Sequence, residues 1–297
     1  MMPLAGIVSA RYDWVGGDSR RTPDITPAGN WYTTASTLVL LVHGYNVTQG
    51  EALDEAYGKF LKILPERMNA KFVGILWPGD EKYFSTLRFP WTIGKAEPSA
   101  ECIAKFVAEI ASGSSAKRII IVAHSLGCRV MLEMFNKLQE ADLGPAVIEQ
   151  FYAMAAAVPV NHLEENGRYR EAEDFIEQKY ACFSSSDMVL QLAFRLGNPV
   201  AALFGEETGL HFEATGVEGE PRDYWTDSFN FNPNGHSSYW KDFRIASRIT
   251  RILGGAPDGR IAENTTAIHN TVSRQDTPFR DTEVRKTPDS RFGSRLT

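Results

Sequence analysis

The feature that most constrains the fold of this chain is an apolar run that leads into a turn of small residues around a serine. Residues 119–123 are all apolar and mostly β-branched, a composition typical of a strand buried on both faces. The run continues into His124, Ser125, Leu126 and Gly127, and an amphipathic pattern typical of a helix follows over residues 126–139. Small residues two positions before and after Ser125 allow a sharp turn, so we predict that its hydroxyl projects at the edge of a sheet.

Similar apolar runs alternate with helical patterns along the chain, which indicates an α/β fold with a mostly parallel central sheet and helices on both faces. Strands are predicted at residues 37–42, 72–77, 118–123, 151–157, 180–184 and 210–215. Helices are predicted at residues 48–64, 97–111, 126–139, 188–196 and 237–253, and the charged stretch 163–178 is interpreted as a solvated helix.

Length and composition favour one large domain. The chain has 297 residues, of which 43% are hydrophobic, enough to bury a single core over residues 1–254. Residues 255–297 are rich in Thr, Arg, Asp and Pro and carry little apolar surface to offset the entropy of ordering. We therefore expect a polar C-terminal tail that is flexible or ordered by a partner.

Charge and hydropathy exclude several classes of protein. The net charge is −6 and the basic residues form no cluster, so nucleic acid is not an expected partner. No apolar run reaches the roughly 20 residues needed to cross a bilayer, so no integral membrane segment is expected. The first ten residues lack a basic leader, and Cys102, Cys128 and Cys182 lie in apolar patterns, as buried free thiols would. We expect a cytoplasmic protein without a metal or cofactor.

A second turn, at residues 43–46, follows another predicted strand and supports the interpretation of the Ser125 turn as part of a functional site. The apolar residues 38–42 run into His43, Gly44, Tyr45 and Asn46. With the Ala-His-Ser-x-Gly turn, this motif resembles the α/β-hydrolase superfamily over about residues 36–254, and it looks most like a poorly characterised bacterial branch. Ala123 stands where the common pattern has glycine, which is a small departure.

The resemblance implies roles for both turns. Ser125 would be the nucleophile, and the backbone N–H groups of Tyr45 and Leu126 would hold the oxyanion that forms during attack. Gly44 would allow close approach of the backbone, and His43 is interpreted as a structural hydrogen-bonding residue. Asn46 could assist the oxyanion or serve the turn.

A serine hydroxyl needs a base and a group that orients the base, and this fold orders them Ser, acid, His along the chain. Of the histidines after Ser125, His236 lies in a loop directly before the last predicted helix, as the family's base does. Asp187 follows a predicted strand and is the expected acid, although it could instead cap the helix after it. The histidines set aside are His162 and His211, and the competing acids are Asp223, Asp227, Glu164 and Glu165.

These assignments predict a serine hydrolase that cleaves a carboxylic ester of a small-molecule acyl substrate through an acyl-enzyme, while thioester and amide hydrolysis would use the same machinery. Serine at the turn, rather than aspartate, argues against the haloalkane-dehalogenase and epoxide-hydrolase branches. Aromatic residues in 77–91 and 224–231 could line an acyl pocket or pack on the sheet. Two alternatives stay open: a lipase or phospholipase effector acting on membrane lipids, and a catalytically silent binding module.

Overall fold

The computed structural model describes residues 2–11, 23–29, 31–66, 68–80, 94–111, 118–140, 148–171, 175–194 and 213–254. The chain divides into two units, Met1–Asp258 and Gly259–Thr297. The second unit and the whole of the predicted tail at residues 255–297 lie outside the described residues.

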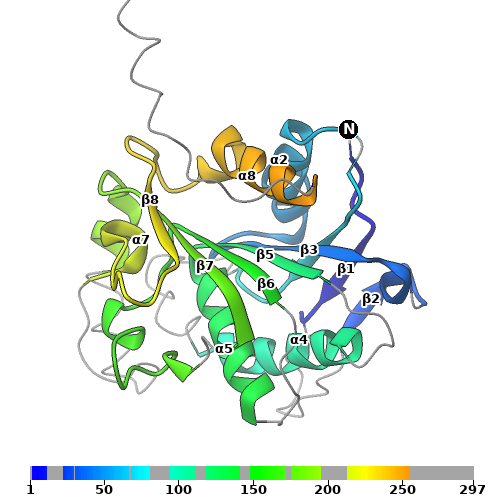
Figure 1. Ribbon diagram of the computed structural model, residues 1–297, viewed down its shortest axis with the longest axis horizontal. Coiled ribbons are helices and arrows are strands. Elements are labelled where there is room, and N and C mark those ends of the chain that lie inside the picture. The colour runs from blue at the N-terminus through cyan, green and yellow to red at the C-terminus, as the bar shows by residue number, and fades with distance from the viewer. Residues whose placement is uncertain are drawn as a thin grey trace, which may run out of the picture. The chain divides into compact units, whose positions relative to one another are not determined.

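The first unit is built on a sheet of eight described strands in the order β2-β1-β4-β3-β5-β6-β7-β8 (Figure 1). Only the β1–β2 pair is antiparallel, so the expected mostly parallel central sheet is confirmed. The strands are β1 (Gly6–Ser9), β2 (Asp24–Thr26), β3 (Thr37–Val42), β4 (Lys71–Leu76), β5 (Arg118–His124), β6 (Ile148–Met154), β7 (Ile176–Phe183) and β8 (Asp227–Asn230).

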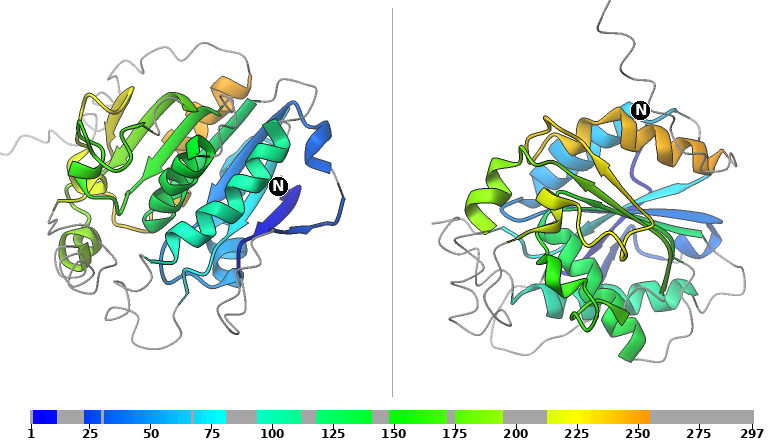
Figure 2. Two further views of the ribbon diagram at one scale, coloured as in Figure 1. Left: turned by 90° about the horizontal axis from the view of Figure 1, so that it is seen from below. Right: turned by 60° about the vertical axis from the view of Figure 1, so that its left-hand side comes forward.

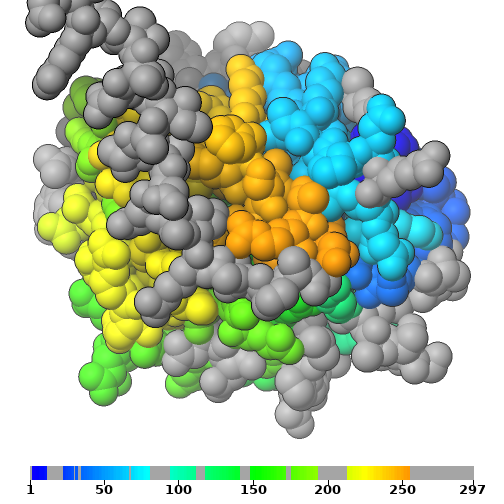
Figure 3. All heavy atoms as spheres, turned by 45° about the horizontal axis from the view of Figure 1, so that its top comes forward, coloured from blue at the N-terminus to red at the C-terminus, as the bar shows by residue number. Residues whose placement is uncertain are grey.

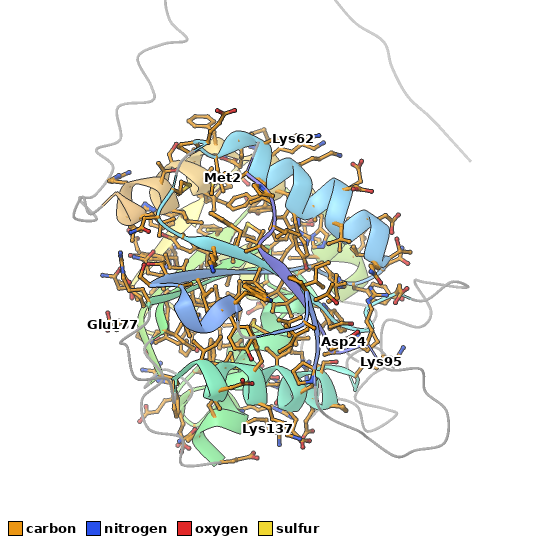
Figure 4. All side chains as sticks on the ribbon, turned by 90° about the vertical axis from the view of Figure 1, so that its right-hand side faces the viewer. Met2, Asp24, Lys62, Lys95, Lys137 and Glu177 are labelled. Carbon is orange, nitrogen blue, oxygen red and sulfur yellow. The ribbon has the colours of Figure 1, made fainter. Side chains whose placement is uncertain are left out.

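Helices cover both faces of this sheet. One face carries α2 (Gly58–Ile63) and α8 (Phe243–Leu253), and the other carries α4 (Ala96–Ala111) and α5 (Leu126–Glu140) (Figures 1 and 2). In the space-filling view, α8 in orange lies beside the light-blue segment that contains α2 (Figure 3). Lys62 of α2 and Lys137 of α5 mark the outer sides of the two helical layers (Figure 4). The remaining helical elements are α1 (Gln49–Glu51), α7 (Thr215–Glu218), the π-helical η2 (Ala52–Tyr57) and η5 (Leu190–Phe194), and the 3-10 helices η1 (Trp31–Thr34), η3 (Val160–His162) and η6 (Tyr239–Lys241).

The predicted elements that agree best with the structure are those with the strongest local sequence patterns. All six residues of β3 are buried, as are six of the seven residues of β5, because helices cover both faces of these central strands. Thr48 forms the predicted capping box: its side chain accepts from the Glu51 N–H, and the Glu51 carboxylate accepts from the Thr48 N–H. The predicted helix over 48–64 therefore exists, as the consecutive α1, η2 and α2.

The prediction of a solvated helix over residues 163–178 was wrong. The described residues 163–171 form turns, and Ile176–Gln178 belong to β7. A positive φ of 68° at Asn166 breaks the helical path. The charges have tertiary partners: Arg168 pairs with the buried Glu133 at 2.8 Å, and Arg170 pairs with Asp223 at 2.9 Å.

Two further predictions need correction. Of the strand expected at 210–215, residues 210–212 lie outside the described part, Ala214 forms an isolated bridge to Pro159, and Thr215 begins α7. The expected helix over 237–253 is divided into η6 and α8, because the Asp242 side chain accepts from the Arg244 N–H and caps a new helix. The strands β1, β2 and β8 were not predicted.

Candidate active site

Ser125 occupies a strained turn between β5 and α5. Its φ is 54°, a left-handed value that is uncommon for a residue with a side chain. Backbone hydrogen bonds hold this conformation: the Ser125 N–H donates to the Met154 carbonyl at 2.9 Å, and its carbonyl accepts from the N–H groups of Cys128 and Ala157. The structure therefore contains the strand, turn and helix expected from the sequence, with Ser125 only 4% exposed.

Two glycines allow the turn after β3 to lie directly against the Ser125 turn. A Cβ at Gly127 would be 2.3 Å from the His43 carbonyl oxygen, and a Cβ at Gly44 would be 2.8 Å from the Ser125 Cβ. Either contact would force the backbones apart. As a result, Gly44 lies next to the Ser125 side chain.

The loops after β7 and β8 bring Asp187 and His236 to the serine. His236 Nε2 lies 2.9 Å from Ser125 Oγ, and His236 Nδ1 lies 2.7 Å from Asp187 Oδ2. The Asp187 side chain is fully buried. A carboxylate in this position accepts from Nδ1–H, which leaves Nε2 as an acceptor for the serine hydroxyl.

The helix cap expected as the alternative role of Asp187 is present in the structure. Asp187 Oδ1 accepts from the Leu190 N–H at 3.1 Å, while Oδ2 faces His236. The two carboxylate oxygens thus divide the two tasks.

The competing side chains have other surroundings. Among the acids, Asp223 pairs with Arg170, Asp227 accepts from the Ser228 N–H, and Glu164 and Glu165 are exposed. His162 is buried against Tyr169, with 5.5 Å between the ring centroids, and His211 lies outside the described residues.

His124 has a contact that sequence reasoning missed. Its Nε2 donates to the backbone carbonyl of His236 at 2.7 Å, and the two rings lie 4.8 Å apart. Tyr239 and Trp240 flank the ring, and burial lowers the pKa of His124 to about 3. His124 is therefore a neutral donor that ties the His236 loop to β5.

Asn232 supplies a second tie that the sequence did not reveal. Its Oδ1 accepts from Ser184 Oγ at 2.7 Å and from the Ser186 N–H at 3.2 Å, and its Nδ2 donates to Ser185 Oγ at 2.7 Å. The segment before His236 is thus bonded to the turn before Asp187. In the sequence, the run of three serines at 184–186 is the one local feature that marks this set of hydrogen bonds.

His43 is buried beneath the turn after β3. The backbone N–H of His43 donates to the Tyr57 hydroxyl at 3.0 Å, and its backbone carbonyl accepts from Trp77 Nε1 at 2.7 Å. The imidazole ring stacks on the Trp77 ring. Burial lowers the pKa of His43 to about 4. These contacts fit the structural role expected for His43.

The two expected oxyanion donors lie on either side of Ser125. Leu126 is the first residue of α5, where a backbone N–H has no acceptor within its own helix. Tyr45 directly follows Gly44 and is partly buried. The Asn46 N–H donates to the Gly79 carbonyl at 2.7 Å and its φ is 55°, which favours the turn role for Asn46. The donor roles of Tyr45 and Leu126 stay predictions.

The two buried histidines predict a pH-dependent stability. In the unfolded chain both would have a pKa near 6.5, so between about pH 4 and 6.5 the unfolded state binds more protons than the folded state. The free energy of unfolding should therefore decrease as the pH is lowered through this window, by about 2.5 kcal/mol per histidine between pH 7 and 4.5.

Urea unfolding at a series of pH values measures this decrease. His124→Gln keeps an N–H donor for the His236 carbonyl but cannot be protonated, so its unfolding free energy should depend less steeply on pH. Equal slopes for the wild type and His124→Gln would contradict the assignment of a low pKa to His124.

Four of the five described aromatic residues considered for an acyl pocket are buried. Trp77, Tyr224, Trp225 and Phe231 are at most 5% exposed, so they pack within the core, and residues 81–91 lie outside the described part. By contrast, Met188, Val189 and Leu192 lie within five residues after Asp187 and are 59%, 50% and 58% exposed.

Within the described ranges, no cluster of three or more His, Cys, Asp or Glu side chains could hold a metal ion, and Cys102, Cys128 and Cys182 are buried and not joined in a disulfide. No helix in those ranges is long and apolar enough to cross a membrane.

Comparison with known families identifies the chain. Residues 32–203, more than half of its length, match the model of a family described as alpha/beta hydrolase of unknown function (DUF900). The chain belongs to this family. The match covers both turns and the acid but ends before His236, and a search of curated proteins found no match.

Solved structures with a similar fold are distant in sequence. The RedJ thioesterase from the prodiginine pathway of Streptomyces coelicolor is 12% identical, with a TM-score of 0.40, over 73% of this chain and 85% of that one. A lipase-esterase related protein from Clostridium acetobutylicum is 10% identical, with a TM-score of 0.43, over 73% and 94%. A Pyrobaculum calidifontis esterase is 11% identical, with a TM-score of 0.40, over 74% and 76%.

Proposed function

We propose that this α/β hydrolase is a serine hydrolase that cleaves a carboxylic ester, or a related acyl bond, of a small-molecule substrate. The observation that carries the proposal is the line of two hydrogen bonds from Ser125 Oγ through His236 to the buried Asp187, at 2.9 and 2.7 Å. A base that is oriented in this way is what activates a serine hydroxyl at neutral pH.

In the proposed reaction, Ser125 Oγ attacks the carbonyl carbon while His236 Nε2 takes the hydroxyl proton. The resulting oxyanion accepts hydrogen bonds from the N–H groups of Tyr45 and Leu126. The intermediate expels the leaving group, which receives the proton from His236, and an acyl-enzyme remains. Water, deprotonated by His236, then attacks the acyl-enzyme and releases the acid. Asp187 keeps its negative charge and stabilises the imidazolium in both stages.

The surface after Asp187 supports an apolar acyl group. Met188, Val189 and Leu192 present three exposed apolar side chains within five residues of the acid. An acyl chain that leaves the reaction centre along this segment would cover apolar surface that is otherwise in water. Short-chain and medium-chain esters are therefore the first substrates to test, followed by thioesters, amides and phospholipid vesicles.

A fluorophosphonate probe tests the proposal before any substrate is known. The wild type should be labelled covalently, and Ser125→Ala should not be labelled at all. Wild-type protein that is folded and resists labelling would favour the alternative of a silent binding module. Hydrolysis of phospholipid vesicles in preference to soluble esters would favour a lipase or phospholipase.

A further inference from the structure

The imidazole of His43 is the centre of a hydrogen-bond chain that ends at the carbonyl of Gly44, the residue packed against Ser125. The backbone N–H of Trp77 donates to His43 Nε2 at 3.3 Å, and His43 Nδ1 donates to the Gly44 carbonyl at 2.8 Å. We propose that His43 is a positioning residue that orients the Tyr45 N–H toward the oxyanion by anchoring the Gly44 carbonyl. This inference rests on the proposed function.

The partners of the ring fix a single tautomer. A carbonyl oxygen can only accept a hydrogen bond, so His43 Nδ1 carries the proton, and a backbone N–H can only donate, so Nε2 is unprotonated. The ring itself is held in place, because it is fully buried and stacks on Trp77 with ring centroids 5.7 Å apart and planes 14° apart. The neutral form is favoured since burial lowers the pKa of His43 to about 4.

Peptide geometry links the Gly44 carbonyl to the Tyr45 N–H. Both belong to one planar trans peptide, so they point in opposite directions and rotate together. A hydrogen bond that holds the carbonyl therefore also sets the direction of the N–H. The donor groups of Trp77, His43 and Tyr45 follow one another in the same sense, so each bond should polarise the next and strengthen the last donor.

Gly44 explains why such an anchor is needed. The close contact with Ser125 excludes any side chain at this position, since a Cβ on residue 44 would lie only 2.8 Å from the Ser125 Cβ. Glycine, however, lets the following peptide take many orientations. On its far side the turn is tied by the Asn46 N–H to the Gly79 carbonyl at 2.7 Å. His43 supplies the second tie, at the peptide that would meet the oxyanion.

Three substitutions separate this role from simple packing. In His43→Asn the amide nitrogen can replace Nδ1 and bond the Gly44 carbonyl, whereas in His43→Gln it replaces Nε2, and His43→Phe has no donor. With p-nitrophenyl butyrate, we expect kcat to fall about 10- to 100-fold in His43→Phe and His43→Gln, and clearly less in His43→Asn, while KM stays near the wild-type value. Affinity for an alkyl trifluoromethyl ketone, whose serine adduct carries an oxyanion, should fall in parallel with kcat.

His162→Asn is the matched control, because His162 is another buried histidine and has no part in the proposed site; its kcat should be unchanged. Melting temperatures show whether each variant folds. Equal losses in the Asn and Gln variants, or ketone affinity that does not follow kcat, would overturn the proposal.

The tautomer of His43 can also be measured in the wild-type protein, so this test does not depend on whether a variant folds. Nitrogen NMR of ¹⁵N-histidine protein should find His43 with a proton on Nδ1 and none on Nε2, and the opposite tautomer would overturn the proposal. The two proposals also fail differently. Unlabelled wild type would remove the proposed function, whereas a labelled and active enzyme that is indifferent to His43 would remove only this inference.

Discussion

His236→Ala is expected to lower kcat/KM about 10⁶-fold, and the addition of Ser125→Ala to this variant should cost almost nothing more. The reason is that Ser125 Oγ and His236 Nε2, 2.9 Å apart, act as one unit. Without the imidazole the hydroxyl stays protonated and is a weak nucleophile, and without the hydroxyl the imidazole has no proton to take. The losses should therefore overlap rather than multiply.

Rates of p-nitrophenyl butyrate hydrolysis by the two single variants and the double variant measure this overlap. His162→Ala serves as the control for removal of a buried imidazole elsewhere in the fold. Losses that multiply in the double variant would mean that Ser125 and His236 contribute independently. A His236→Ala enzyme with nearly full activity would exclude His236 as the base.

Predictions from the sequence succeeded where short-range patterns decide the structure. The central strands β3 and β5 are buried on both faces and read as continuous apolar runs, and the Thr48 capping box needs only four consecutive residues. The order of Ser125, Asp187 and His236 followed from the resemblance to a known fold. Their meeting at one edge then follows from the parallel strands, whose carboxyl ends share that edge.

Short strands at or next to the two edges of the sheet left too weak a pattern to detect. The strands β1, β2 and β8 have four, three and four residues, and none of them is buried throughout. Segments this short do not show a period of two, and pairing with a neighbouring strand decides their conformation. The prediction of a helix that includes residues 163–171 failed for a related reason. Charged side chains there pair with distant residues such as Glu133 instead of lining the exposed face of a helix.

The contacts that support the candidate site join residues far apart in the chain. His124 and His236 are 112 positions apart, Ser184 and Asn232 are 48 apart, and His43 and Trp77 are 34 apart. No local pattern encodes such pairs, since each depends on which strands become neighbours. The sequence therefore predicted a serine, a base and an acid that the structure brings within hydrogen-bond distance, whereas the partners of His43, His124 and Asn232 required the structure.

Asp187→Asn should lower kcat/KM about 10⁴-fold and leave the melting temperature nearly unchanged. In the wild type both carboxylate oxygens accept hydrogen bonds, Oδ1 from the Leu190 N–H and Oδ2 from His236 Nδ1. Asparagine has only one oxygen. Because the buried Leu190 N–H requires an acceptor, the amide oxygen should stay there and turn the NH₂ group toward His236.

That orientation selects the wrong tautomer of the base. His236 Nδ1 must then accept from the amide, so the proton moves to Nε2, which can no longer accept from Ser125 Oγ. The variant should keep the fold and the helix cap but lose hydrolysis and most of the fluorophosphonate labelling. Asp223→Asn, on an exposed acid that pairs with Arg170, is the control and should keep wild-type activity. If Asp187→Asn hydrolysed p-nitrophenyl butyrate at a rate near that of this control, the orientation of His236 by Asp187 would not matter for the reaction.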